Sequence, residues 1–188
     1  VYSAYSSENI KIALAFQREV INNIVPEVQP DLIHCNDWMT GLIPAMAREL
    51  DIPCLFTIHN IYTVKIALAE IEDRGIDAAS FWHYLYYDHP PQNYEESRET
   101  NKVDLLTSGV FAAHFVNTVS PTFLSEIIEG RHPFIESPVR QELSHKWHAG
   151  CAAGILNSPD PSFDPATDED LAGRYDEQTF AKGKKQNK

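Results

Sequence analysis

Two short apolar segments, each followed at once by polar residues, constrain the fold of this chain more than any other feature. The first covers residues 32–35 and is followed by Asn36 and Asp37, and the second covers residues 54–58 and is followed by His59 and Asn60. A short continuous apolar segment is typical of a parallel strand that is covered on both faces. Because ligands of open α/β sheets bind beyond the carboxyl ends of the strands, these polar residues are candidate site residues.

The order of the predicted elements indicates an α/β fold, with a Rossmann-like parallel sheet and helices on both faces. The spacing of apolar residues predicts a helix over residues 8–25, with Ser7 as its N-cap and with Pro26 and Pro30 closing the segment. Alternation of helices and strands favours a doubly wound sheet. The other predicted elements are strands at 32–35, 54–58, 115–119 and 152–156 and helices at 40–50, 105–114 and 122–128.

The length of 188 residues suggests that residues 1–188 form a single, partial domain. Residues 61–104 are the least regular, and we expect them to form a partly helical insertion over one end of the sheet. We expect a linker helix within residues 175–188. The chain opens on a helix, without the strand and glycine-rich turn that usually begin a Rossmann-like half, so we expect the latter part of such a domain.

Composition and charge exclude some classes of partner. The net charge of −12 argues against binding of nucleic acid through a basic surface, and no apolar segment reaches membrane-spanning length.

The three cysteines, Cys35, Cys54 and Cys151, are odd in number and lie in apolar surroundings. That usage suits a reducing compartment. We therefore expect a cytoplasmic protein, or one of the plastid stroma if the source is a plant.

Each candidate residue could bind a ligand or could have a purely structural role, and the residues alone do not decide between the two. Asp37 is suited to N-capping the helix that follows it, and Ser120 before a proline is a common helix start. Asn157 is equally suited to a turn with positive φ, and His59 to a loop hydrogen bond. No Gly-x-Ser-x-Gly sequence is present, and no cysteine has an evident base beside it.

A metal site is not expected. His145, His148 and Cys151 have a spacing that loosely suggests metal ligation. No second pair of ligands completes the usual set of four, so we expect neither a metal nor another cofactor.

Five motifs together resemble those of the glycogen and starch synthases, which are retaining glucosyltransferases of the two-domain GT-B type. The motifs follow the family's order and spacing over nearly the whole chain. The resemblance implies that the chain is the latter part of the N-terminal, acceptor-side domain of a GT-B fold. The motifs are His34-Cys-Asn-Asp37-Trp38, Thr57-Ile-His59-Asn60, Asn117-Thr-Val-Ser120-Pro121-Thr122, Gly154-Ile-Leu-Asn157 and Asp164-Pro-Ala-Thr-Asp168.

The resemblance also implies an activity. The family transfers glucose from ADP-glucose, the favoured donor here, or from UDP-glucose to an α-1,4-glucan acceptor, with retention of configuration. It implies that His59 assists at the anomeric carbon and that Asp37, Asn157, Asn60 and Ser120 bind the substrate. The family's Lys-x-Gly-Gly-Leu motif and its C-terminal domain are not in this sequence, so we expect the isolated chain to be inactive and the C-terminal domain to be its partner.

Two segments depart from the family pattern. The residues after His59 read Asn-Ile-Tyr-Thr-Val-Lys rather than Asn-Leu-Ala-Tyr-Gln-Gly, and Ser158-Pro159 stands where the family commonly has Gly-Ile. These changes leave an alternative open, in which the chain is a non-catalytic glucan-binding or regulatory module derived from such a domain.

Overall fold

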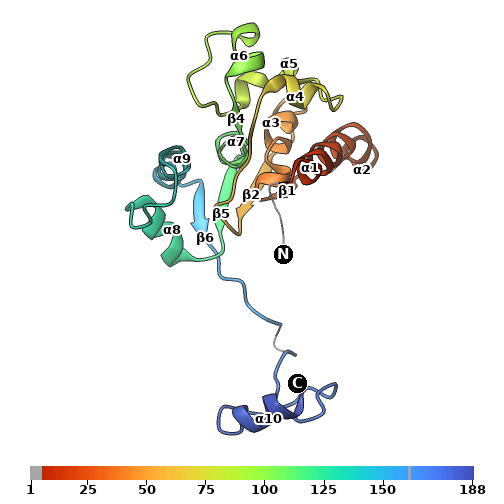
Figure 1. Ribbon diagram of the computed structural model, residues 1–188, viewed down its shortest axis with the longest axis vertical. Coiled ribbons are helices and arrows are strands. Elements are labelled where there is room, and N and C mark those ends of the chain that lie inside the picture. Colours follow the sequence, from red (N-terminus) through yellow and green to blue (C-terminus); the bar gives the residue numbers. More distant parts are fainter. Residues whose placement is uncertain (1–5, 161) are drawn as a thin grey trace. The chain divides into compact units, whose positions relative to one another are not determined.

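The computed structural model describes residues 6–160 and 162–188 (Figure 1). Contacts between Cα atoms divide the chain into two compact units, Val1–Leu156 and Asn157–Lys188.

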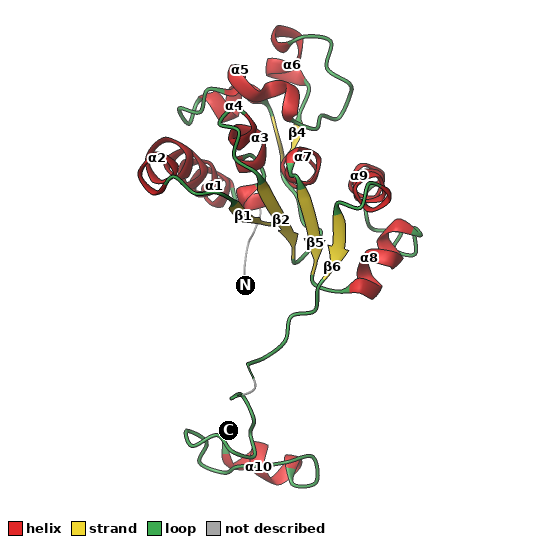
Figure 2. Cartoon of the chain, turned by 180° about the vertical axis from the view of Figure 1, so that it is seen from behind, coloured by secondary structure: helices red, strands yellow, loops and turns green. Residues whose placement is uncertain are grey.

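The first unit is built on a parallel sheet of four strands in the order β1-β2-β5-β6 (Figure 2). Cys35 lies opposite Phe56, and Phe56 lies opposite Val116, so the carboxyl ends of the strands meet at one edge. The expected Rossmann-like α/β class, with a parallel sheet flanked by helices, is confirmed. The strands are β1 (Ile33–Asn36), β2 (Cys54–Ile58), β5 (Phe115–Thr118) and β6 (Ala152–Gly154).

The helices of the first unit connect these strands. The helix α9 was not among the predicted elements, although its buried Val139 and Leu143 are spaced by one helical turn. The helices outside residues 61–104 are α1 (Ser7–Glu19), a π-helical segment (Val20–Ile24), α2 (Val25–Val28), a 3₁₀ turn (Trp38–Thr40), α3 (Ile43–Arg48), α7 (Leu105–Ala112), α8 (Pro121–Ile128) and α9 (Ser137–His148).

The first helical segment differs from the prediction at both ends. Its N-cap is Ser6 rather than Ser7, because the Ser6 hydroxyl accepts a hydrogen bond from the Asn9 N–H at 3.2 Å. At the other end the chain stays helical through Pro26, which lies in the first turn of α2. Pro26 follows the π-helical segment Val20–Ile24 closely, and such a segment already departs from the regular α-helical hydrogen-bond pattern. Gln29, with φ of 49°, ends the segment instead.

The core of the first unit lies against one face of the sheet. The side chains of Cys35, Phe56 and Val116 share that face and are almost fully buried. Helix α7 packs closely on it, since a Cβ added at Gly109 would lie 2.4 Å from the Phe56 ring. The opposite face bears His34, which is exposed.

Residues 61–104 contain more regular structure than their sequence suggests. Ile66, Leu68 and Phe81 are at most 3% exposed and belong to the same core cluster as Phe56. The short strands of this segment pair antiparallel in a sheet of their own. Its elements are β3 (Lys65–Ile66), α4 (Leu68–Glu72), α5 (Ala78–Phe81), a 3₁₀ turn (Trp82–Tyr84), α6 (Tyr94–Thr100) and β4 (Val103–Asp104).

One loop within this segment closes on itself. The His89 N–H donates to Asn101 Oδ1 at 3.1 Å, and Asn101 Nδ2 donates to the His89 carbonyl at 2.8 Å. The ends of the loop that carries α6 are therefore joined directly.

The second unit is short and holds α10 (Phe180–Gln186), inside the range where a linker helix was predicted. Gly183 of α10 is buried, and a Cβ added there would lie 2.2 Å from Cβ of Tyr175. Across the described part of both units, every helix is too short or too polar to cross a membrane.

Candidate functional site

The ends of β1 and β2 form the centre of the candidate site. Asp37 follows β1 directly, and its N–H donates to the Thr57 carbonyl of β2 at 3.0 Å. Its backbone has φ of 55° and ψ of −178°, a conformation that few residues other than glycine adopt. The residue is only 8% exposed, so Asp37 is buried at the carboxyl edge of the sheet.

The Asp37 carboxylate holds the segment that follows β2. Oδ1 accepts hydrogen bonds from the N–H groups of His59, at 2.8 Å, and Asn60, at 3.3 Å, and Oδ2 accepts one from Asn60 Nδ2 at 3.2 Å. Asp37 makes no side-chain cap of the turn Trp38–Thr40, so the capping role left open by the sequence is not observed. The carboxylate instead fixes the backbone of two candidate residues.

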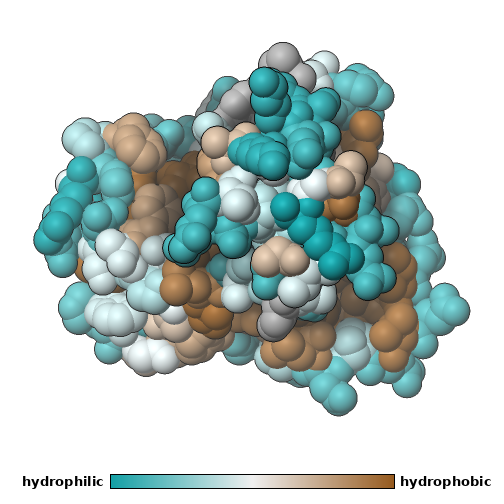
Figure 3. Space-filling model, turned by 90° about the horizontal axis from the view of Figure 1, so that it is seen from below, coloured by the Kyte–Doolittle hydropathy of each residue, from teal (hydrophilic) through white to brown (hydrophobic). Residues whose placement is uncertain are grey.

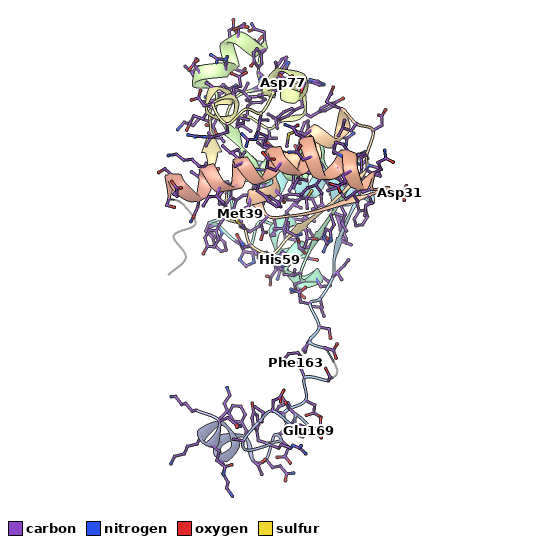
Figure 4. All side chains as sticks on the ribbon, turned by 90° about the vertical axis from the view of Figure 1, so that its right-hand side faces the viewer. Asp31, Met39, His59, Asp77, Phe163 and Glu169 are labelled. Carbon is purple, nitrogen blue, oxygen red and sulfur yellow. The ribbon has the colours of Figure 1, made fainter. Side chains whose placement is uncertain are left out.

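His59 is exposed beyond the end of β2. Its Nε2 lies 3.0 Å from Oδ1 of Asn36, the last residue of β1. In Figure 4, His59 and Met39 both lie away from Asp31, which precedes β1, as expected for residues at the carboxyl end of the sheet. The structure therefore places an imidazole where a ligand of an open α/β sheet would bind.

Asn60 and Ser120 have partners within the protein. The Asn60 side chain donates to Asp37 and accepts from the Tyr62 N–H at 3.0 Å, so both ends of its amide are used. Ser120 caps α8, because its hydroxyl accepts from the Phe123 N–H at 3.1 Å. The helix start predicted at Ser120 is therefore confirmed.

Asn157 is exposed and begins the second unit, so it is not among the residues that the first unit brings together. The strand before it ends at Gly154, and the Ile155 N–H donates to the Thr118 carbonyl at 2.8 Å.

A row of hydrogen bonds crosses three strands next to this edge. Thr57 Oγ1 donates to Asn117 Oδ1 at 2.6 Å and lies 2.7 Å from His34 Nε2. Since the Thr57 hydroxyl has one proton, which it gives to Asn117, His34 Nε2 must be the donor in the second bond. Sequence reasoning did not assign roles to these three residues or to Asn36. Successive side chains of a strand point to opposite faces, so polar residues in each of three predicted strands could have indicated a shared polar face.

An apolar hollow of about 850 Å³ lies beside the candidate site. Ile12 and Phe16 of α1 border it and are more than half exposed, as is Tyr62. Figure 3 shows apolar patches between polar regions on one face of the molecule. The residues that line the hollow are Asn9, Ile12, Ala13, Phe16, Asn36, Trp38, Met39, Thr40, Asn60 and Tyr62.

The histidines and cysteines have contacts of other kinds. His148 Nδ1 lies 2.7 Å from the Ser144 carbonyl, and His145 pairs with Glu142 at 3.3 Å. Within residues 6–160 and 162–188, no group of three or more potential ligands is close enough to hold a metal ion. The hydrogen bond to Cys54 and burial together raise the pKa of the Cys35 thiol, so this cysteine stays uncharged.

The geometry defines a Rossmann-like α/β unit whose polar residues gather at the carboxyl edge of its parallel sheet, which is the ligand edge of that class of domain. The family model of the starch synthase catalytic domain matches residues 1–136, and the chain belongs to this family.

Individual relatives agree with this assignment. The glycogen synthase of Exiguobacterium sibiricum is 31% identical over 179 residues, covering 90% of this chain and 34% of the relative. That of Cellvibrio japonicus is 32% identical over 157 residues, covering 81% of this chain and 29% of the relative. The chain thus spans about a third of the length of these relatives.

A solved structure shares the fold. The catalytic domain of starch synthase IV from Arabidopsis thaliana, bound to ADP and acarbose, superposes with a TM-score of 0.67 at 23% identity. The match covers 92% of this chain and 35% of that one.

Proposed function

We propose that this chain forms the acceptor-side wall of the active site of a glycogen or starch synthase-like glucosyltransferase. The observation that carries the proposal is the pair of hydrogen-bonded strand ends, in which Asp37 fixes the backbone of His59 and Asn60. Family membership supports the same class of reaction.

The proposed reaction moves a glucosyl group between two oxygens. The bond between the anomeric carbon and the donor phosphate oxygen breaks, and a bond to a hydroxyl oxygen of the α-1,4-glucan forms on the same face. The acceptor proton passes to the departing phosphate oxygen, which releases the nucleoside diphosphate. This route retains the configuration and requires no nucleophile from the protein.

In this proposal His59 lies at the anomeric centre. Its dipole, held in place before the reaction, stabilises the positive charge that develops on the sugar. Asp37, Asn60, Ser120 and Asn157 bind substrate hydroxyls. For Asp37 and Asn60 the contacts described above support a second task, because both residues also set the position of the loop that carries His59.

We propose ADP-glucose as the donor and an α-glucan as the acceptor. The ADP and acarbose bound to the Arabidopsis relative support both classes of ligand. The net charge of −12 gives this chain few cations for phosphate binding. We therefore propose that the donor phosphates are held by a C-terminal domain outside this chain, in keeping with the greater length of the relatives, and that this chain alone does not catalyse transfer.

The test is carried out on the whole open reading frame that encodes this chain. Incorporation of labelled glucose into glycogen is measured with ADP-glucose and with UDP-glucose. His59→Ala should lower kcat by at least about 100-fold, as expected when a preorganised electrostatic contact is lost, while thermal unfolding stays unchanged. Equal rates for the variant and the parent would remove the role of His59. Transfer by the 188-residue chain alone would overturn the partial-site proposal.

One observation favours a second candidate function, a non-catalytic glucan-binding module. The segments after His59 and Asn157 differ from the family pattern, and both lie next to proposed substrate contacts. This candidate predicts binding of maltoheptaose by the chain in calorimetry, together with no glucose transfer by the whole reading frame from either donor.

A further inference from the structure

The imidazole of His59 is held by a residue outside its own loop. Its Nε2 lies 3.0 Å from Oδ1 of Asn36, which is 23 residues earlier and ends the neighbouring strand. Asn36 is itself fixed, because the Thr40 hydroxyl accepts from the Asn36 N–H at 2.7 Å and donates to the Asn36 carbonyl at 2.8 Å. Both the N–H and the carbonyl of Asn36 are therefore hydrogen-bonded to the Thr40 hydroxyl, which fixes the backbone that carries the acceptor of the imidazole contact.

Backbone and ring of His59 are held by two consecutive residues of the adjacent strand end. Asp37 accepts from the His59 N–H at 2.8 Å, and Asn36 contacts the ring. A backbone bond leaves χ1 and χ2 of a histidine free, so Asp37 alone does not determine where the imidazole points. The contact with Asn36 supplies the missing constraint.

We propose that Asn36 is a positioning residue that fixes the orientation and the tautomer of the His59 imidazole. An amide oxygen only accepts hydrogen bonds, so the neutral ring must carry its proton on Nε2. Nδ1 is then the unprotonated ring atom, and it accepts a hydrogen bond from a ligand hydroxyl. The role of Nδ1 in glucose transfer rests on the proposed function. The orientation and the tautomer of the ring do not depend on it.

The tautomer is tested on the 188-residue chain itself, with histidine labelled by ¹⁵N and measured by NMR at a pH where the rings are neutral. In the parent chain we expect a protonated Nε2 and an unprotonated Nδ1 for His59. A proton on Nδ1 would overturn the proposal without any variant, because the ring would then face the amide N–H of Asn36.

Two variants whose side chains branch at Cγ, as asparagine does, separate the loss of the acceptor from a change in side-chain shape. Asn36→Leu removes the acceptor and should convert the His59 signals to those of a mixture of tautomers. Asn36→Asp retains an oxygen and should retain the proton on Nε2. The control Asn22→Leu changes an exposed asparagine of the π-helical segment and should leave His59 unchanged. Equal spectra for Asn36→Leu and the parent, or equal loss in both variants at residue 36, would contradict the proposal.

The consequence for transfer is measured on the whole reading frame. Asn36→Leu should lower kcat by about 10-fold to 100-fold with little change in KM, because a misplaced group costs rate rather than ground-state binding. Asn36→Asp should recover most of the loss. If the reading frame shows no transfer at all, the proposed function fails while the NMR result still decides the positioning role. A fall in kcat of equal size in both variants would show that the acceptor oxygen at residue 36 does not determine the rate of transfer.

Discussion

At the scale of single residues, Asp37 is the position on which most of the site geometry depends. It combines a positive φ with a buried carboxylate that accepts three hydrogen bonds from the segment after β2. Asparagine keeps one acceptor oxygen for these hydrogen bonds, whereas alanine keeps none.

We therefore expect Asp37→Ala to lower the free energy of unfolding by about 1–3 kcal/mol, the usual cost of leaving buried polar partners unsatisfied. Asp37→Asn should cost clearly less, because it retains an acceptor oxygen for the N–H groups of His59 and Asn60. Urea unfolding monitored by circular dichroism measures both. Equal losses in the two variants would indicate that the charge, rather than the acceptor geometry, holds the loop.

His114 gives a prediction for the pH dependence of stability. Its Nδ1 accepts from the Cys54 N–H at 3.1 Å, and burial, together with the cations Arg48 and Lys146, lowers its pKa. The unfolded chain, in which the histidine pKa is about 6.5, therefore takes up the proton first. This contribution to stability is full above about pH 6.5 and is lost as the pH falls toward the lower folded pKa.

His114→Asn keeps an acceptor near the position of Nδ1 but does not titrate. We expect the fall in melting temperature between neutral and mildly acidic pH to be shallower for this variant than for the parent chain. His148→Asn, at an exposed histidine of α9, is the matched control and should keep the parent slope. An unchanged slope in His114→Asn would show that other groups determine the acid sensitivity.

At the scale of elements, the 3₁₀ turn after β1 packs directly on the start of α7. A Cβ added at Gly41 would lie 1.9 Å from the carbonyl oxygen of Leu105, which is a backbone atom and cannot rotate away. Gly41 has an ordinary helical φ of −67°, so contact rather than backbone strain requires glycine here.

Gly41→Ala should therefore lower the free energy of unfolding by about 1–3 kcal/mol or more, as overpacking does. Gly150→Ala is the contrasting variant, since a Cβ there meets nothing within 4 Å but the backbone has φ of 71°. Its cost should be about 1 kcal/mol, from strain alone. Chemical unfolding of both variants checks the order; a smaller loss for Gly41→Ala would contradict the close packing.

At the scale of the whole molecule, the core belongs entirely to the first unit. Every residue of the hydrophobic core cluster lies at or before Ala152. A chain truncated after Leu156 should thus retain a cooperative thermal transition, with a midpoint close to that of the complete chain. Calorimetry on both forms makes the comparison, and a non-cooperative transition in the shorter form would show that the second unit is needed for folding.

How far the sequence predicts the molecule depends on the range of the interactions involved. The strand Cys54–Ile58 has the bounds predicted for it, because a strand covered on both faces is recognisable from a continuous apolar segment in the sequence. Helix α9 was missed because its two buried residues stand among polar neighbours. Asp37 and His59 were predicted as site residues, but the contact between His59 and Asn36 was not, since it depends on how two side chains meet across strands.

The loop closed by His89 and Asn101 is a suitable site for inserting a label or a tag. Its ends are joined by two hydrogen bonds, so extra residues inserted within it add little to the entropy of closing it. Pro90 and Gln92, near its start, are exposed. A fluorescent label or an affinity tag placed there would report on the protein without disturbing the strand ends that carry His59.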